Sequence, residues 1–270
     1  MRYSVTAGGK RLRPVLCLAT TEAVGGDREL AMPAACALEL IHTYSLIHDD
    51  LPAMDDDTMR RGRPTLHVVA GEGIAILAGD GLLTEAFALL ARAPQEINSV
   101  TSERKLRVVG HIATAAGPIG MVGGQAIDLY ASLSGQNGLE TSPLNANALR
   151  LMHAKKTGAL IRVSATVGAI MGGADDGTIE HIEAAATEFG LAFQIVDDIL
   201  DVEGVSVHLG KTAGKDVAAG KPTYPALYGL ESARRMAEEC LERAESALHA
   251  ANLSQSRLPQ IGRWIVHRSN

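Results

Sequence analysis

The sequence has few aromatic residues, few cysteines and no excess of positive charge. Aromatic side chains make up only 3% of the 270 residues and β-branched runs are short, so the composition favours helices over strands. A net charge of −6 without a long tail of one sign argues against nucleic acid as a main partner. Cys17, Cys36 and Cys240 have no disulfide or metal-site spacing, and we expect three buried thiols in a reducing compartment.

The sequence also lacks long hydrophobic runs. No stretch approaches the ~20 uninterrupted apolar residues of a membrane span, and the first residues do not form the apolar core of a signal peptide. We therefore expect a cytoplasmic protein without a membrane span.

Apolar residues recur at helical spacing over most of the chain, and no segment alternates with period two. The predicted helices are Leu12–Val24, Leu30–His48, Gly73–Ala91, Thr101–Ala116, Met121–Ala131, Asn145–Gly172, Thr178–Val202, Pro222–Gly229, Ala233–Ala250 and Leu258–Arg268. No change in composition marks a linker, so residues 1–270 are predicted to form one all-α domain. The second, sixth and seventh of these helices are apolar on nearly every side and should be central.

Two acidic clusters each interrupt an apolar helix. They contain Asp49, Asp50 and Asp55, and Asp197, Asp198 and Asp201. Asp197 and Asp201 are four residues apart and share one helix face. Asp49 and Asp50 end a helix, where the macrodipole and mutual repulsion disfavour carboxylates, so a cation is expected. Hard oxygen ligands favour magnesium or manganese over zinc. Helix caps or a solvated face are the alternative, but a solvated face needs no apolar neighbours on every other side.

Basic residues accompany these clusters. They are Lys10, Arg11 and Arg13 at a glycine-bounded helix start, Arg60, Arg61 and Arg63 after the first cluster, Lys155 and Lys156 in an apolar helix, and Lys211, Lys215 and Lys221 after the second. Arginine and lysine commonly bind diphosphate oxygens. Each basic group taken alone could instead consist of ordinary surface residues that keep the protein soluble. A lysine pair inside an apolar helix, however, needs an anionic partner.

In order and spacing, these segments resemble the trans-isoprenyl diphosphate synthases, or polyprenyl synthetases, and most of all the bacterial farnesyl diphosphate synthases. The matching segments are 8–14, 49–61, 156–158, 193–194, 197–201 and 210–225, which together extend over essentially the whole chain. The resemblance implies a single-domain isoprenoid-synthase-type helical bundle with a central active-site cavity. It also implies Mg²⁺-dependent condensation of an allylic diphosphate with isopentenyl diphosphate by a homodimer.

The resemblance further assigns roles to individual residues. About three Mg²⁺ ions per site, replaceable by Mn²⁺, would be held by Asp49, Asp50, Asp55, Asp197, Asp198 and Asp201. The allylic diphosphate would be drawn off by these ions and by Arg60, Lys156, Lys211 and Lys221. Isopentenyl diphosphate would be held by Lys10, Arg13, His42 and Arg61, and the carbocation steadied by Thr157 and Gln194. A packed core histidine is the alternative for His42, which lies two helical turns before Asp49.

Product length is expected to depend on Tyr44 and Ser45, which lie roughly 6–8 Å deeper along the helix than Asp49. An aromatic residue at the deeper position resembles farnesyl diphosphate synthases, so we expect the fifteen-carbon product. A geranylgeranyl diphosphate synthase, a non-catalytic partner subunit and a class I terpene cyclase are the alternatives. Only residues 1–7 precede the Gly8–Pro14 motif, where the family has a longer segment, so the N-terminal helix is expected to be missing or truncated.

Overall fold

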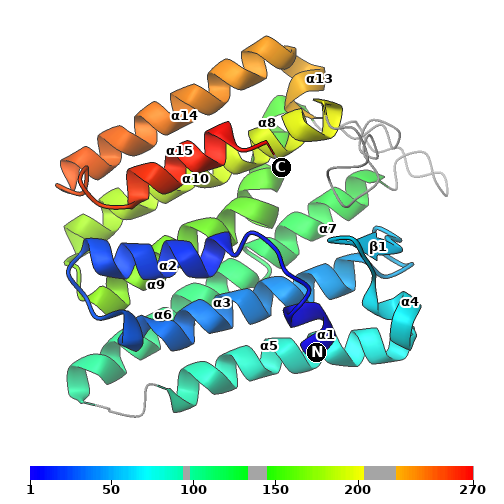
Figure 1. Ribbon diagram of the computed structural model, residues 1–270, viewed down its shortest axis with the longest axis horizontal. Coiled ribbons are helices and arrows are strands. Elements are labelled where there is room, and N and C mark those ends of the chain that lie inside the picture. Colours follow the sequence, from blue (N-terminus) through cyan, green and yellow to red (C-terminus); the bar gives the residue numbers. More distant parts are fainter. Residues whose placement is uncertain (94–97, 133–144, 204–222, 270) are drawn as a thin grey trace.

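The computed structural model describes residues 1–93, 98–132, 145–203 and 223–269, and in these ranges it is a helical bundle (Figure 1). The elements are α1 (Arg2–Val5), α2 (Leu12–Ala23), α3 (Arg28–Asp49), β1 (Met59–Arg60), β2 (Arg63–Pro64), α4 (Leu66–Ala70), α5 (Glu72–Arg92), α6 (Ser99–Ala116), α7 (Met121–Ser132), α8 (Ala146–His153), η1 (Ala154–Gly158), α9 (Ala159–Gly172), α10 (Asp176–Glu203), α13 (Tyr224–Tyr228), α14 (Leu230–Ala250) and α15 (Leu258–His267). The predicted all-α fold is confirmed.

The core lies where the sequence predicts it. Helix α3 packs against α2, α5 and α9, while α10 packs against α9 and α14. Their inward side chains, such as Leu38 of α3, Leu160 of α9 and Ile195 of α10, are fully buried. Burial of such apolar side chains, through the hydrophobic effect, is the main stabilising contribution to a bundle of this kind.

The ends of the helices place both acidic clusters at one end of the bundle. The C-terminal ends of α3 and α10 lie on the same side as β1, the start of α2 and the C-terminus of the chain (Figure 1). This arrangement brings together segments that are about 150 residues apart in the sequence, which is the separation of Asp49 and Asp198.

Three features differ from the sequence-based expectation. The predicted helix Asn145–Gly172 is divided by η1, a five-residue π-helical segment. The antiparallel pair of β1 and β2, in which Met59 pairs with Pro64, and the short helix α4 were not predicted, because two to five residues show no periodicity. Helix α1 lies where a truncated N-terminal helix was expected. Cys17 and Cys240 are buried as predicted, but Cys36 is exposed, because α3 has an outward face even in the core.

By length and composition alone, α3 and α5 could each cross a membrane. The most apolar window of α3 is 56% buried in the bundle, whereas that of α5 is only 33% buried. This is weak evidence for a membrane span, because core helices of globular proteins satisfy the same criteria. The low burial of α5 instead leaves an apolar surface on the bundle.

Candidate active site

The first acidic cluster is shaped by a wide turn at the end of α3. Asp49 is the last residue of the helix, and the backbone N–H of Asp55 donates to the carbonyl oxygen of Asp49 over 2.9 Å. The chain therefore returns over the helix end after Pro52, which has no N–H to continue the helix. The turn keeps Asp55 beside Asp49.

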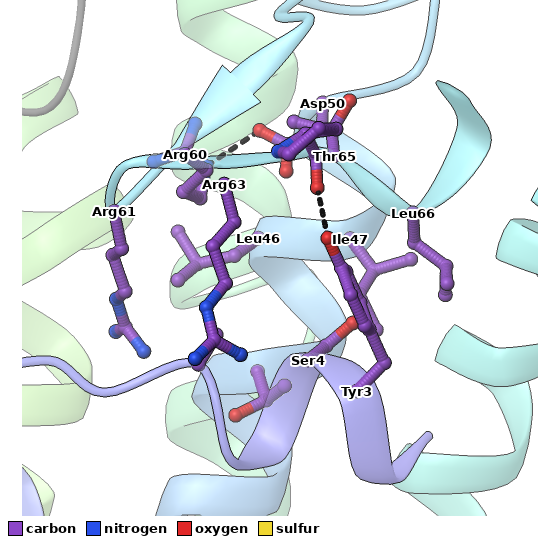
Figure 2. Close-up of a pocket in the computed structure, with 13 residues that line it drawn as sticks. Tyr3, Ser4, Leu46, Ile47, Asp50, Arg60, Arg61, Arg63, Thr65 and Leu66 are labelled. Atoms are coloured by element: carbon purple, nitrogen blue, oxygen red, sulfur yellow. Dashed lines mark hydrogen bonds and ion pairs between the residues drawn. The ribbon is translucent and has the colours of Figure 1, made fainter. Parts of the chain in front are cut away.

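Asp50 is engaged inside the protein rather than directed to open solvent. Its side chain is buried, and its Oδ1 atom accepts a hydrogen bond of 2.5 Å from Nε of Arg60, whose Nη2 lies 3.2 Å from Asp57. Arg60 is positioned by the β1–β2 pair (Figure 2). A cavity of about 40 Å³ lies beside this ion pair and is lined also by Arg61 and by residues of α1.

Burial disfavours the charged form of the carboxylates in the first cluster. Burial raises the pKa of Asp49 to about 6; Lys156 opposes this shift, while Asp55 adds to it. Burial likewise raises the pKa of Asp50 to about 6, although Arg60 opposes it. Closely placed carboxylates with raised pKa values are a site at which a hard cation would bind favourably.

The π-helical segment η1 places Lys156 near the first cluster. Nζ of Lys156 lies 2.5 Å from Oδ2 of Asp128 on α7. Burial alone would lower the pKa of Lys156, but Asp128, Asp55 and Asp49 together raise it, so the ammonium is retained. Single π-helical turns are frequent at functional sites because they re-aim side chains within a helix.

Two glycines allow η1 to approach its neighbours. A Cβ atom on Gly124 of α7 would lie 2.2 Å from the backbone nitrogen of Lys156, and one on Gly190 of α10 would lie 3.0 Å from Cα of Gly158. Both helices therefore contact the backbone of η1 at positions where a side chain would not fit.

A chain of hydrogen bonds connects η1 to the second cluster. The Thr157 hydroxyl donates to Oε1 of Gln194 over 3.0 Å, and Nε2 of Gln194 donates to Oδ1 of Asp198 over 2.9 Å. The backbone N–H of Tyr224 donates to the other carboxylate oxygen of Asp198 over 3.0 Å. Asp198 is only 3% exposed.

The other aspartates of the second cluster are more accessible. The Asp197 side chain is 43% exposed, and Nη2 of Arg268, at the end of the chain, lies 3.2 Å from its Oδ1 atom. The Arg268 guanidinium also covers the Phe193 ring, with 4.2 Å to the ring centroid, and Nζ of Lys10 lies 5.9 Å from that centroid. Phe193 thus joins the C-terminus, the Gly8–Pro14 segment and α10.

A separate group of cations surrounds His42. Burial and the neighbouring Arg13 and Arg61 lower the pKa of His42 well below its usual value, so the ring is neutral at pH 7. Burial lowers the pKa of Arg13 to about 10, and Nε of Arg13 has no hydrogen-bond partner among the described residues. Glu39 is the neighbouring acid: Arg11 donates to it over 2.6 Å. The cluster has spare donors that could receive an anion.

Arg61 reaches this cluster across the Gly8–Pro14 segment, where it donates to the Gly8 carbonyl oxygen over 2.5 Å. A Cβ atom on Gly9 would lie 2.4 Å from the guanidinium carbon of Arg61, and Gly9 has a positive φ of 111°. The positive φ favours glycine at position 9, whereas the flexible Arg61 guanidinium could move away from a Cβ atom there.

The structure gathers most of the predicted site residues at one end of the bundle. Lys211 and Lys221 lie outside the described residues. In the described part of the chain, no three His, Cys, Asp or Glu side chains already form a metal-binding group. The carboxylate-only donor set still fits a hard cation such as Mg²⁺, which usually completes its coordination with water and substrate phosphate oxygens.

Sequence reasoning missed four contributors to this site. They are Glu39, Asp128, the backbone N–H of Tyr224, and Arg268. Glu39 and Asp128 could have been found, because each is a single acid within an apolar helix and therefore needs a partner. No local sequence pattern identifies the other two, which depend on tertiary packing.

Comparisons with known proteins identify a family for the chain. Residues 1–255 match the polyprenyl synthetase family. Over its full length the chain is 48% identical to heterodimeric geranylgeranyl pyrophosphate synthase large subunit 1 of Arabidopsis thaliana, covering 71% of that protein. It is 44% identical to farnesyl diphosphate synthase of Geobacillus stearothermophilus, again over its full length and 88% of the relative.

Solved structures give the same result. An FPP/GFPP synthase from Zymomonas mobilis is 38% identical with a TM-score of 0.83, over 98% of this chain and 86% of that one. A geranyltransferase from Helicobacter pylori, complexed with magnesium and isoprenyl diphosphate, is 33% identical with a TM-score of 0.83, over 98% and 85%. The chain therefore belongs to the polyprenyl synthetase family and is a trans-prenyltransferase.

Proposed function

We propose that this protein condenses dimethylallyl or geranyl diphosphate with isopentenyl diphosphate in the presence of Mg²⁺, and that farnesyl diphosphate is its main product. The observation that carries the reaction is the pairing of two aspartate clusters with the Lys156–Asp128 ion pair, beside a separate cationic group around His42. Together they provide one site for a metal-bound diphosphate and another for a metal-free diphosphate.

The aspartate clusters would hold Mg²⁺ through their more accessible members, Asp49, Asp55, Asp197 and Asp201. Bound Mg²⁺ would supply Lewis-acid stabilisation of the diphosphate oxygens. The donor set supports this ion, as does the magnesium bound in the Helicobacter pylori relative.

The allylic C–O bond would break with its electron pair leaving on the diphosphate, and Lys156 and Arg60 would stabilise that negative charge. The hydroxyl oxygen of Thr157 and the amide oxygen of Gln194 would face the resulting carbocation. The double bond of isopentenyl diphosphate would then attack the cation to form the new C–C bond. Loss of a proton to the departed diphosphate would leave a new double bond.

The second substrate would lie in the cationic group around His42. Arg13, Arg61 and Lys10 would contact its diphosphate, and the free Nε of Arg13 supports this role. A neutral His42 could donate one N–H to the same anion without adding charge.

Tyr44 supports the fifteen-carbon product. It is only 8% exposed and lies five residues before Asp49 on α3, about 7.5 Å deeper in the helix at 1.5 Å per residue. Its ring packs edge-on against His48, with 5.8 Å between the ring centroids, so the phenol is held in place. A geranylgeranyl diphosphate synthase is the second candidate, because relatives of that name are 43–48% identical to this chain.

A homodimer would cover the apolar surface of α4 and α5. The exposed large apolar side chains there are Val68, Val69, Ile74, Ile76 and Leu77. Exposed apolar surface of this extent is typical of protein–protein contacts. A heterodimer is the alternative, because the Arabidopsis relative is named as a heterodimeric large subunit.

Product analysis tests the proposal. The protein is incubated with dimethylallyl and isopentenyl diphosphates, with Mg²⁺ and in parallel with a chelator. Farnesyl diphosphate formed only with Mg²⁺ is the expected result. Twenty-carbon product would keep the reaction and overturn the chain-length proposal. No prenyl product from the folded protein, with geranyl diphosphate also supplied, would overturn the proposed reaction.

A further inference from the structure

The two adjacent aspartates of the second cluster have different environments. Asp197 and Asp201 share one face of α10, whereas Asp198 shares a face with Gln194, which is four residues earlier. The Asp197 side chain is 43% exposed, but Asp198 is only 3% exposed, and each of its carboxylate oxygens accepts a hydrogen bond. Asp198 is therefore buried, and its carboxylate accepts hydrogen bonds from groups within the protein.

The carboxylate of Asp198 determines which way the Gln194 amide points. Both oxygens of the carboxylate act as acceptors, and the end of the amide that faces Asp198, at 2.9 Å, is its NH₂ group. The carbonyl oxygen must then face the opposite way, where the Thr157 hydroxyl donates to it over 3.0 Å. With the Asp198 carboxylate as the acceptor, the orientation of the other two groups follows.

We propose that Asp198 is a positioning residue that holds the carbonyl oxygen of Gln194 toward the reacting carbons, and that it is not a magnesium ligand. The inference rests on the proposed function, in which Gln194 faces the carbocation. A reversed amide would present partially positive N–H groups to the cation instead of a partially negative oxygen. The backbone N–H of Tyr224 holds Asp198 from the other side.

The variant Asp198→Asn tests the proposal with almost no change in volume. Its amide can still accept from Tyr224, but it presents an NH₂ group to Gln194 and so favours the reversed orientation. We expect kcat to fall by about 100-fold or more, since misdirected dipoles at a developing charge cost that much. The Mg²⁺ concentration for half-maximal rate should change by less than about 3-fold. The matched variant Asp197→Asn should raise that concentration by about 10-fold or more.

A double-mutant cycle shows whether Asp198 acts through Gln194. In a Gln194→Met background there is no amide to orient, so adding Asp198→Asn should lower kcat by less than about 3-fold further. Asp198→Asn alone should also be more damaging than Gln194→Met alone, because it reverses a dipole rather than removing it. Equal effects of Asp198→Asn in the two backgrounds would overturn the proposal.

Two measurements do not depend on turnover. The side-chain amide NMR signal of Gln194 can be identified in the wild-type spectrum by its loss in Gln194→Met. Relative to the wild type, this signal should shift in Asp198→Asn and stay in place in Asp197→Asn. Calorimetric titration with Mg²⁺ and inorganic pyrophosphate should give similar affinities for the wild type and Asp198→Asn. An affinity loss equal to that of Asp197→Asn would overturn the proposal. If the wild type makes no prenyl product, the proposed function fails, while the NMR result still tests the Asp198–Gln194 contact.

Discussion

The ammonium of Lys156 lies 2.5 Å from the carboxylate of Asp128, although 28 residues separate them in the sequence. Asp128 holds a cation that two of the three acids of the first cluster, Asp49 and Asp55, also attract. The lysine thus has a fixed position before any substrate arrives. Fixed charges that need no rearrangement during a reaction are the most effective electrostatic catalysts.

Replacing this carboxylate should therefore impair catalysis. Asp128→Asn leaves Lys156 with a weaker, neutral partner, and we expect kcat/KM to fall by about 10- to 100-fold. Steady-state kinetics with saturating Mg²⁺ measures the effect. Asp176→Asn is the control, because it removes an acid whose side chain is 82% exposed and pairs with Arg107 on the surface. Equal activities of the two variants would contradict the role of Asp128.

Gly124 should be sensitive to the addition of a single methyl group. A Cβ atom there would lie 2.2 Å from the nitrogen of Lys156, so Gly124→Ala must displace η1 or α7. Overpacking of this kind costs about 1–3 kcal/mol of stability, and displacement of Lys156 should lower kcat as well. Thermal denaturation and kinetics measure both effects.

Gly110→Ala is the matched control for Gly124→Ala. Gly110 lies within α6, and a Cβ atom there would meet nothing within 4 Å. Alanine should stabilise this helix by about 0.5–1 kcal/mol, because it loses less conformational freedom on folding. If both alanine variants were equally stable, the close approach of α7 to η1 would not be real.

Much of this architecture could be predicted, because helix formation and burial leave a local signal. The apolar periodicity of residues 30–48 and 178–202 predicted the two central helices that carry the acidic clusters. The same pattern gave no sign of η1, since the switch from α- to π-helical geometry depends on the packing of Gly124 and Gly190 against it.

The site, like the fold, could be predicted from the sequence only in part. The residue types in the two clusters indicated a cation and a diphosphate, but not which carboxylates are engaged inside the protein. The contacts of Asp50 with Arg60 and of Asp198 with Tyr224 connect segments 10 and 26 residues apart, and neither contact follows from spacing. Neighbouring aspartates appear equivalent in the sequence, and only the tertiary structure distinguishes their environments.

The raised pKa values of Asp49 and Asp50 should make stability depend on pH. Both are about 6 in the folded protein, against the ordinary value of 3.8. Between these values the folded state binds more protons than the unfolded state, so the free energy of unfolding falls as pH rises and levels off above pH 6. Denaturation in the presence of a chelator measures this slope.

The double variant Asp49→Asn with Asp50→Asn should reduce the slope, because neither position then titrates. Mg²⁺ with pyrophosphate should stabilise the wild-type protein more strongly above pH 6 than below it, since the ions compete with protons for the same oxygens. Identical pH dependence of the wild-type protein and the double variant would show that these carboxylates are not the titrating groups.

Tyr44 should limit product length if its side chain ends the space available to the growing chain. Tyr44→Ala removes a nearly buried ring and opens the volume it fills, so we expect products longer than fifteen carbons from the same substrates. Chromatography of the dephosphorylated products measures the distribution. Ser45→Ala is the control, because it removes one hydroxyl that, among the described residues, donates to the carbonyl oxygen of His42. Unchanged fifteen-carbon product from Tyr44→Ala would show that the ring packs in the core without limiting the length of the product. Longer products from both variants would show that this turn of α3, rather than the aromatic ring, limits the length.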